Sequence, residues 1–242
     1  MVRVKMIARR EVTLAVILSA AAGYLDAVGY VYLGGFFVSF MSGNTTELAT
    51  GVAHGDWAPA RLAGTLIGMF FAGAVLGALL NRISDGRTVV LAGTTILVGL
   101  TALLGDLSRS TWPVALLLPL AMGVVNATFL SSGEASIGLT YMTGALVKAG
   151  QRLVDALFGG PRRLWARHLS LWAALLAGGV IGAAMLGWIG LGGALWPITG
   201  LLAVITLIVA LDRRRRGVFG LGTRQVRPVT TVVAPSDSDT RQ

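Results

Sequence analysis

The chain has 242 residues, of which 55% are hydrophobic and 13% are charged, and its mean hydropathy is +0.75. A soluble domain carries about 25% charged residues, so this composition excludes an ordinary soluble protein and predicts a chain that lies in a lipid bilayer. The net charge of +9 comes from basic residues scattered between apolar segments, which argues against a nucleic-acid partner, and the absence of cysteine excludes disulfides and cysteine-ligated metals.

A basic segment opens the chain and precedes an apolar run from Val12 to Tyr32. A basic start followed by an apolar run is also typical of a secretory signal peptide. However, Asp26 and its neighbours belong to a block that recurs later in the chain, so we interpret this run as the first membrane span. Residues 1–10 are then a basic cytoplasmic N-terminus.

Five further apolar stretches are long enough to cross a hydrocarbon core of roughly 30 Å as helices. They cover about residues 59–81, 88–105, 112–131, 167–189 and 192–211.

Two less apolar segments, about residues 35–55 and 134–158, lie between these spans. A lipid-facing crossing of the second segment would carry Lys148, Arg152 and Asp155, at a cost of roughly 2.5–3.5 kcal/mol for each charge at mid-bilayer. We therefore expect both segments to be broken or re-entrant. The predicted fold is an all-α polytopic membrane protein with about six transmembrane helices and two such segments.

Three short blocks occur twice in the same order, with an offset of about 100 to 105 residues. They are Gly-Tyr-Leu-Asp-Ala at 23–27 with Gly-Val-Val-Asn-Ala at 123–127, Phe-Met-Ser-Gly at 40–43 with Tyr-Met-Thr-Gly at 141–144, and the glycine-rich stretches at 72–78 and 177–183. Transporters use such duplicated halves, each with a Gly-interrupted polar segment, to build a central binding site.

The duplication divides the chain into a first membrane repeat, residues 11–106, and a second, residues 107–211. Residues 212–242 form a basic and then disordered cytoplasmic tail. Three spans in each half give the halves opposite orientations, so the repeat is inverted. With both termini in the cytoplasm, most arginines lie inside, as the positive-inside rule requires. Eight spans with a parallel repeat satisfy that rule equally well.

Three pairs of glycines have the four-residue spacing of closely packed membrane helices: Gly64/Gly68, Gly73/Gly77 and Gly178/Gly182. This spacing serves folding within one chain as well as a homodimer.

The first candidate site residue is Asp26, about 14 residues into the first span. A carboxylate at that depth needs a partner, a proton or a water-filled cavity, so it predicts a proton or cation site. Its repeat mate, Asn126, keeps an acceptor oxygen without the charge. The alternative is that Asp26 cross-links helices through hydrogen bonds.

The second set of candidates lies in the two broken segments. We expect Gly43 to break a helix, with Asn44 and Thr45 capping the next turn. Thr143 and Gly144 hold the equivalent break in the second copy, where Ala145 and Leu146 replace the two capping residues. A helix N-terminus inside the membrane attracts anions, while freed carbonyls bind cations. A kink that serves packing alone is the competing interpretation.

Counting on from these glycines, Glu47 corresponds to Lys148. Opposite charges at equivalent positions predict an ion pair across the repeat axis, either a gate or a static clamp. A solvated helix face that holds Lys148, Arg152 and Asp155 explains the lysine without any site.

The sequence holds no phosphate-binding glycine loop, no zinc-protease helix and no serine-nucleophile elbow, so we expect no enzyme, no cofactor and no metal site. His54 and His168 are interpreted as polar residues near membrane ends.

The blocks at 23–27, 37–46 and 140–144 together resemble the YoaK-like family of bacterial integral membrane proteins, over about residues 12–211. The resemblance implies an inner-membrane protein of about six helices and gives no substrate. We interpret the chain as a secondary transporter of a small solute or ion, driven by an ion gradient. The alternatives are a channel and a non-transporting membrane scaffold or partner subunit.

Overall fold

The computed structural model describes the chain except for residues 1–8, 84, 109, 132–133, 136–141 and 216–242. The described part is helical apart from one pairing of two-residue strands, which confirms the all-α prediction. The helices are α1 (Arg9–Tyr32), α2 (Met41–His54), α3 (Trp57–Leu80), α4 (Gly86–Leu107), α5 (Trp112–Val125), the short 3-10 helix η1 (Asn126–Phe129), α6 (Met142–Leu157) and α7 (Leu164–Arg215). Strands β1 (Leu130–Ser131) and β2 (Glu134–Ala135) pair antiparallel.

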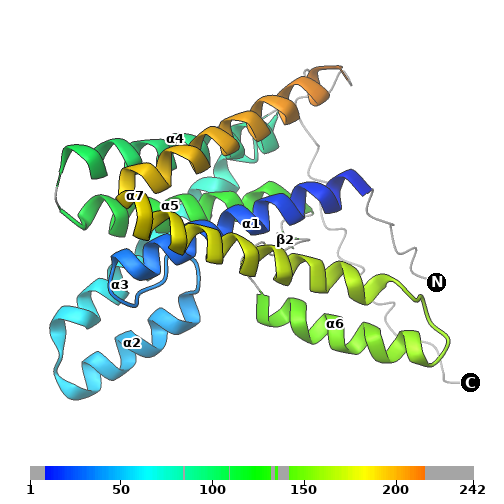
Figure 1. Ribbon diagram of the computed structural model, residues 1–242, viewed down its shortest axis with the longest axis horizontal. Helices are drawn as coiled ribbons and strands as arrows, with labels where there is room; N and C mark the ends of the chain where they lie inside the picture. Colours follow the sequence, from blue (N-terminus) through cyan, green and yellow to red (C-terminus); the bar gives the residue numbers. More distant parts are fainter. Residues whose placement is uncertain (1–8, 84, 109, 132–133, 136–141, 216–242) are drawn as a thin grey trace, which may run out of the picture.

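Five of the described helices are long and apolar enough to cross a membrane: α1, α3, α4, α5 continued by η1, and α7. The last of these has 52 residues and contains Gly190, whose φ of 71° and ψ of −175° interrupt the helix. The chain turns back there, so α7 consists of two arms, each long enough for one span (Figure 1). The six predicted spans are therefore present, with the last two joined at a glycine.

The two polar segments form helices that are too short to cross the bilayer. With 14 and 16 residues, α2 and α6 are about 21 and 24 Å long at 1.5 Å per residue, short of a roughly 30 Å core. α2 packs against α3 and α6 against the first arm of α7, and the two extend in opposite directions along the molecule (Figure 1). That both segments are broken or re-entrant stays a prediction, since the residues just before α6 lie outside the described part of the chain.

The centre of the bundle is formed by α1 and α5. In these helices 56% and 67% of the most apolar stretch is buried, against 22–33% in the other candidate spans. Leu18, Leu25 and Val28 of α1 join Leu118 and Met122 of α5 in one core cluster. The first helix of each predicted repeat is thus the innermost helix of its half.

Close backbone contacts hold α1 against the first arm of α7. A Cβ atom added at Gly23 would clash with the carbonyl oxygen of Leu175. In the reverse direction, a Cβ atom at Gly178 would clash with the carbonyl oxygen of Ala20, and a Cβ atom at Gly182 with the carbonyl oxygen of Tyr24. Only glycine permits this approach, because any side chain would push the two backbones apart.

The same arrangement joins α5 to α3. A Cβ added at Gly123 would clash with the carbonyl oxygen of Phe70, and one at Gly73 with that of Leu120. A Cβ atom at Gly77 would lie 2.7 Å from the carbonyl oxygen of Val124. Each of these contacts corresponds to one between α1 and α7 at the offset of about 100 to 105 residues. Two of the three predicted glycine pairs therefore mediate close helix packing.

The third glycine pair does not. A Cβ atom at Gly68 would meet nothing within 4 Å, and one at Gly64 only a methyl carbon of Leu48, at 3.9 Å. The prediction of close packing at this pair is wrong within the single chain, because α2, which packs against α3, reaches Gly64 only through the Leu48 side chain and leaves Gly68 open.

The helix break before α2 also differs from the prediction. The chain reverses at Gly34 and Gly35, which have φ values of 71° and 105°, whereas Gly43 lies inside the first turn of α2. No side chain caps that helix, so Asn44 and Thr45 are not caps. Two successive glycines end α1 more readily than one because both can adopt positive φ.

Candidate functional site

Asp26 anchors the backbone that leads into α2. Its Oδ1 atom accepts hydrogen bonds from the amides of Val38 (2.9 Å) and Ser39 (2.8 Å). Val38 and Ser39 are buried, so these amides have no water to bind in place of the carboxylate. Asp26 therefore cross-links α1 to the segment before α2 through hydrogen bonds. A proton or cation site at this carboxylate stays a prediction.

Asn44 holds the same segment from the other side. This fully buried side chain accepts a hydrogen bond from the Phe37 amide at 3.0 Å and donates one to the Phe37 carbonyl at 2.6 Å. The side-chain amide thus pairs with the backbone of Phe37 as a neighbouring strand would. Three consecutive residues, 37–39, are fixed by Asp26 from α1 and Asn44 from α2.

Aromatic rings cover the start of α2. The rings of Tyr30 and Phe37 have centroids 4.7 Å apart, and Phe37 meets Phe40 edge to face at 5.2 Å. A Cβ atom at Gly43 would lie 2.8 Å from a ring carbon of Phe40 and 3.0 Å from Phe37. Gly43 is therefore required for close approach of these rings and not for an unusual backbone conformation.

The second copy is described only in part. Asn126 donates from Nδ2 to the Met122 carbonyl, one turn back on the same helix, at 2.7 Å. In the first turn of α6, Gly144 is buried and Thr143 is exposed. Residues 140–141 of the repeated block lie outside the described residues, as does the tail from 216. The stretch that corresponds to residues 37–39 of the first copy also lies outside the described residues.

Glu47 and Lys148 are not brought together. Both side chains are exposed, and their helices, α2 and α6, extend in opposite directions (Figure 1). No ion pair joins them within the described part of the chain. Thr45 is likewise exposed and bonds the Met41 carbonyl of its own helix. On α6, Arg152 forms an ion pair with Asp155 at 2.9 Å, and both side chains are half exposed.

The interior between the two halves is tightly packed. A void of about 10 Å³ lies among apolar side chains of α1, α5 and α7 and the hydroxyl-bearing Thr94 of α4. This is about the volume that the centre of one water molecule occupies. The described conformation therefore has no solute-sized chamber among these residues.

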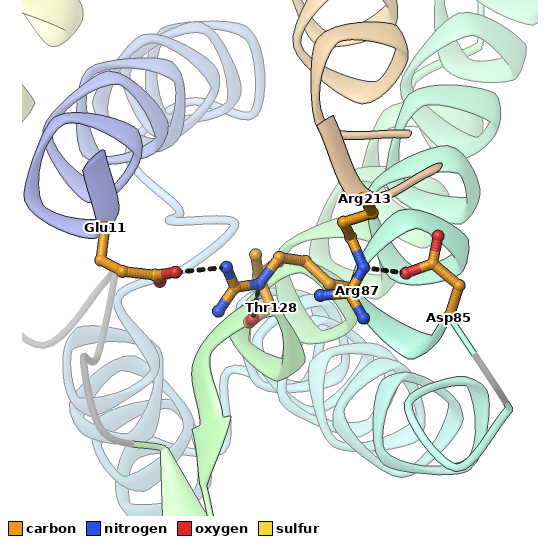
Figure 2. A network of polar contacts seen from close by, with 5 residues as sticks. All are labelled: Glu11, Asp85, Arg87, Thr128 and Arg213. Atoms are coloured by element: carbon orange, nitrogen blue, oxygen red, sulfur yellow. Dashed lines mark hydrogen bonds and ion pairs between the residues drawn. The ribbon is translucent and has the colours of Figure 1, made fainter. Parts of the chain in front are cut away.

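A polar network that the sequence did not predict joins the halves where the chain enters the bundle (Figure 2). Arg87, at the start of α4, pairs with Glu11 of α1 at 2.8 Å and donates to the Thr128 carbonyl of η1 at 3.2 Å. Its guanidinium also lies over the ring of Phe129, with the carbon 5.2 Å from the centroid. One arginine thus connects α1 and α4 of the first half with η1 of the second.

A second ion pair stands beside it, between Asp85 and Arg213 at the end of α7 (Figure 2). Asp85 is buried, and a buried carboxylate requires such a partner. We call Glu11, Arg87, Asp85 and Arg213 the terminal clamp. The sequence signal for it is a lone acid inside each arginine-rich stretch, Glu11 after Arg9 and Arg10 and Asp85 before Arg87.

At the opposite end, Trp196 donates from its indole nitrogen to the Asp106 carboxylate at 3.0 Å. This bond joins the end of α4 to the start of the second arm of α7. Between the two ends, the hydroxyls of Thr95 and Thr206 approach to 3.2 Å. The last helices of the two predicted repeats are therefore linked along their whole length.

Comparison with known proteins gives a family and a relative. Residues 14–208 match the model of a family described as protein of unknown function, DUF1275. A UPF0700 transmembrane protein of Rhizobium meliloti (strain 1021) is 31% identical over 218 residues, which cover 88% of this chain and 94% of that protein. No solved structure matches the chain significantly. These findings agree with the resemblance to a YoaK-like membrane family.

Proposed function

The chain belongs to the DUF1275 family of membrane proteins, and from that membership and the geometry above we propose that it is a secondary transporter of a small solute or ion. The observation that carries the proposal is the pair of short helices, α2 and α6, that extend in opposite directions beside a bundle of membrane-length helices (Figure 1). Transporters place substrate and coupling-ion sites at such discontinuities.

The proposal includes an inverted internal repeat. The reciprocal contacts of Gly23 and Gly178 and of Gly123 and Gly73 support it, since equivalent helices meet at equivalent positions. A repeat of this kind gives the molecule two related conformations, one opened on each side of the membrane. The transporter would lie in the bacterial inner membrane with both termini in the cytoplasm.

In this proposal Asp26 is the proton or cation site that couples to movement of α2. As a carboxylate it accepts two backbone hydrogen bonds, and a proton or a cation on the same group weakens them by withdrawing negative charge. Occupation of Asp26 would therefore loosen residues 37–39 and the half-helix behind them. Gly43, Asn44, Thr45, Asn126, Thr143 and Gly144 remain the proposed contacts of the solute.

The terminal clamp closes the cytoplasmic end in this scheme. Arg87 and Arg213 each bind a carboxylate of the first half, and Arg87 also binds a carbonyl of the second. Breaking these contacts would release the start of α4 from η1 and from the end of α7. The clamp replaces Glu47 and Lys148 as the contact that would open when access alternates, because it already joins the two halves.

The test is solute flux into proteoliposomes. Vesicles that contain an entrapped pH dye are challenged with gradients of small acids, amines, polyols and inorganic ions, and volume is followed by light scattering. We expect saturable uptake of at least one class, accompanied by a pH change, and its loss in Asp26→Asn. Asp155→Asn, a matched change at an exposed carboxylate, should retain uptake. Wild-type vesicles that behave as empty vesicles throughout would reject transport.

The packed interior favours a second candidate, a non-transporting membrane scaffold or partner subunit. The void between the halves holds at most one water, and the polar groups of Asp26 and Asn44 are used to fix backbone. A scaffold needs one conformation only, whereas a transporter must open on both sides. Labelling of cysteines introduced beside the void, with and without solute, separates the two: constant protection is the result that a scaffold predicts.

A further inference from the structure

A groove of about 800 Å³ opens between the first turns of α3 and α5. The two helices touch closely at Gly73 and Gly123 and lie further apart toward their N-terminal ends. The floor of the groove contains small and apolar residues, among them Leu62, Gly64 and Ala115. It is thus an opening on the side of the bundle between a helix of each predicted half, separate from the small void among α1, α4, α5 and α7.

The unfilled glycines of α3 run along this groove. Gly64 lines it, and a Cβ atom added at Gly68, one turn further into the membrane, would have no atom within 4 Å. Below them, Phe71 and Val75 are 69% and 46% exposed, as side chains that face lipid would be. The glycine pair therefore leaves a stretch of α3 without side chains next to the groove.

The mouth of the groove carries a positive charge. Arg61 lines it, and the guanidinium Nε donates to the Trp57 carbonyl at 3.2 Å, which holds the side chain at the helix start. Within the described residues Arg61 has no acidic partner. Thr65 and Thr111 line the groove near it.

Two tryptophans mark the depth of this mouth. Trp57 is 60% and Trp112 is 56% exposed, and each begins one of the two helices. Exposed tryptophans at helix ends are typical of the level of lipid headgroups. An arginine at that level above an apolar groove matches the shape of a phospholipid, with phosphate outward and acyl chain inward.

From this match we propose that the groove binds one anionic phospholipid. The guanidinium of Arg61 binds the phosphate, and one acyl chain lies along Gly64 and Gly68 between α3 and α5. The lipid fills the opening between a helix of each half, so it would stabilise the folded arrangement of the two.

Native mass spectrometry in mild detergent tests the proposal with phosphatidylglycerol as the probe. We expect the wild-type protein to retain one lipid and Arg61→Gln to lower its affinity roughly tenfold, because a charged hydrogen bond to phosphate is lost. Arg61→Lys keeps the charge and should retain part of the binding. Gly64→Leu fills the groove and should abolish retention. Excess inorganic phosphate should not displace the lipid, because it lacks the acyl chain.

Matched controls keep the proposal falsifiable. Arg82→Gln removes an exposed arginine outside the groove, and Gly200→Leu fills a lipid-exposed glycine of α7 that meets nothing within 4 Å. Both should bind the lipid as the wild type does. Equal retention by Arg61→Gln, or an equal loss in Arg82→Gln, would overturn the site. A dimer that becomes a monomer on Gly68→Leu would show a second copy in the groove and also overturn it.

Discussion

Asp26 and Asn44 bind adjacent backbone groups of one short segment from opposite sides. Asp26, on α1, accepts hydrogen bonds from the amides of Val38 and Ser39. Asn44, on α2, accepts one from the amide of Phe37 and donates one to its carbonyl. The segment between the two helices has no secondary structure of its own, so these two side chains supply the hydrogen bonds that a helix or sheet would otherwise provide. The position of α2 depends on both.

This relationship makes Asp26→Ala a strongly destabilising change. It leaves two buried amides without an acceptor, at roughly 1–3 kcal/mol each. Asp26→Asn retains an acceptor oxygen and should cost less than half as much. Thermal unfolding in detergent, followed by circular dichroism, measures both. Equal melting temperatures for the alanine and asparagine proteins would contradict the anchoring role.

Asn44→Ala should also destabilise, by about 1–3 kcal/mol for each Phe37 group left unpaired. Thr45→Ala is the matched control, because that exposed hydroxyl bonds only its own helix, and its effect should stay within about 0.5 kcal/mol. Since Asn44 and Asp26 hold one segment, the double variant should lose less than the sum of the two. Additive losses would show that the residues act independently.

The number and place of the membrane helices follow from apolar length, which a single sequence carries directly. The same is true of Gly73 and Gly178, whose spacing predicts close approach. In contrast, Gly64 and Gly68 have the same spacing without a close backbone contact. Spacing alone states that an approach is permitted, and only the arrangement of the other helices decides whether it occurs.

The site was harder to predict than the fold. The depth of Asp26 marks it as important, but its partners are backbone amides 12 and 13 residues away, which no motif encodes. The chain reversal lies at Gly34 and Gly35, outside the repeated block on which the prediction of a break at Gly43 rested. The terminal clamp depends on pairs such as Glu11 and Arg87, 76 residues apart, that only folding brings together.

The reciprocal glycine contacts predict matching effects in the two halves. Gly178→Leu should separate α7 from α1, and Gly73→Leu should separate α3 from α5, since each side chain would meet a carbonyl oxygen. Overpacking of this kind costs about 1–3 kcal/mol or more, so both proteins should unfold early or aggregate. Gly200→Leu, in open space on α7, should remain as stable as the wild type. Stability is read from monodispersity and melting temperature in detergent.

The terminal clamp predicts unequal effects of its members. Glu11→Gln removes one partly exposed ion pair and should cost at most about 1 kcal/mol. Arg87→Ala removes that pair, the hydrogen bond to Thr128 and the contact with Phe129. Its loss of stability should therefore be larger than that of Glu11→Gln and should vary less with salt concentration. Unfolding at low and high ionic strength measures the difference. Arg82→Ala, an exposed neighbour without such contacts in the described residues, provides the control.

The two short helices predict which loops face which side of the membrane. If α2 and α6 return to the side from which their segments entered, Asp56 lies outside and Ile83 lies in the cytoplasm. If both segments crossed, these two positions would exchange sides. The chain has no cysteine, so Asp56→Cys and Ile83→Cys each introduce one unique thiol at an exposed position.

An impermeant maleimide applied to intact cells distinguishes the two arrangements. We expect labelling of Asp56→Cys from outside and labelling of Ile83→Cys only after the membrane is permeabilised. Lys148 and Arg152 support this outcome, because a crossing α6 would have to place both charges inside the bilayer. The reverse labelling pattern would establish eight spans and a parallel repeat, and it would remove the inverted symmetry on which the proposed alternating access depends.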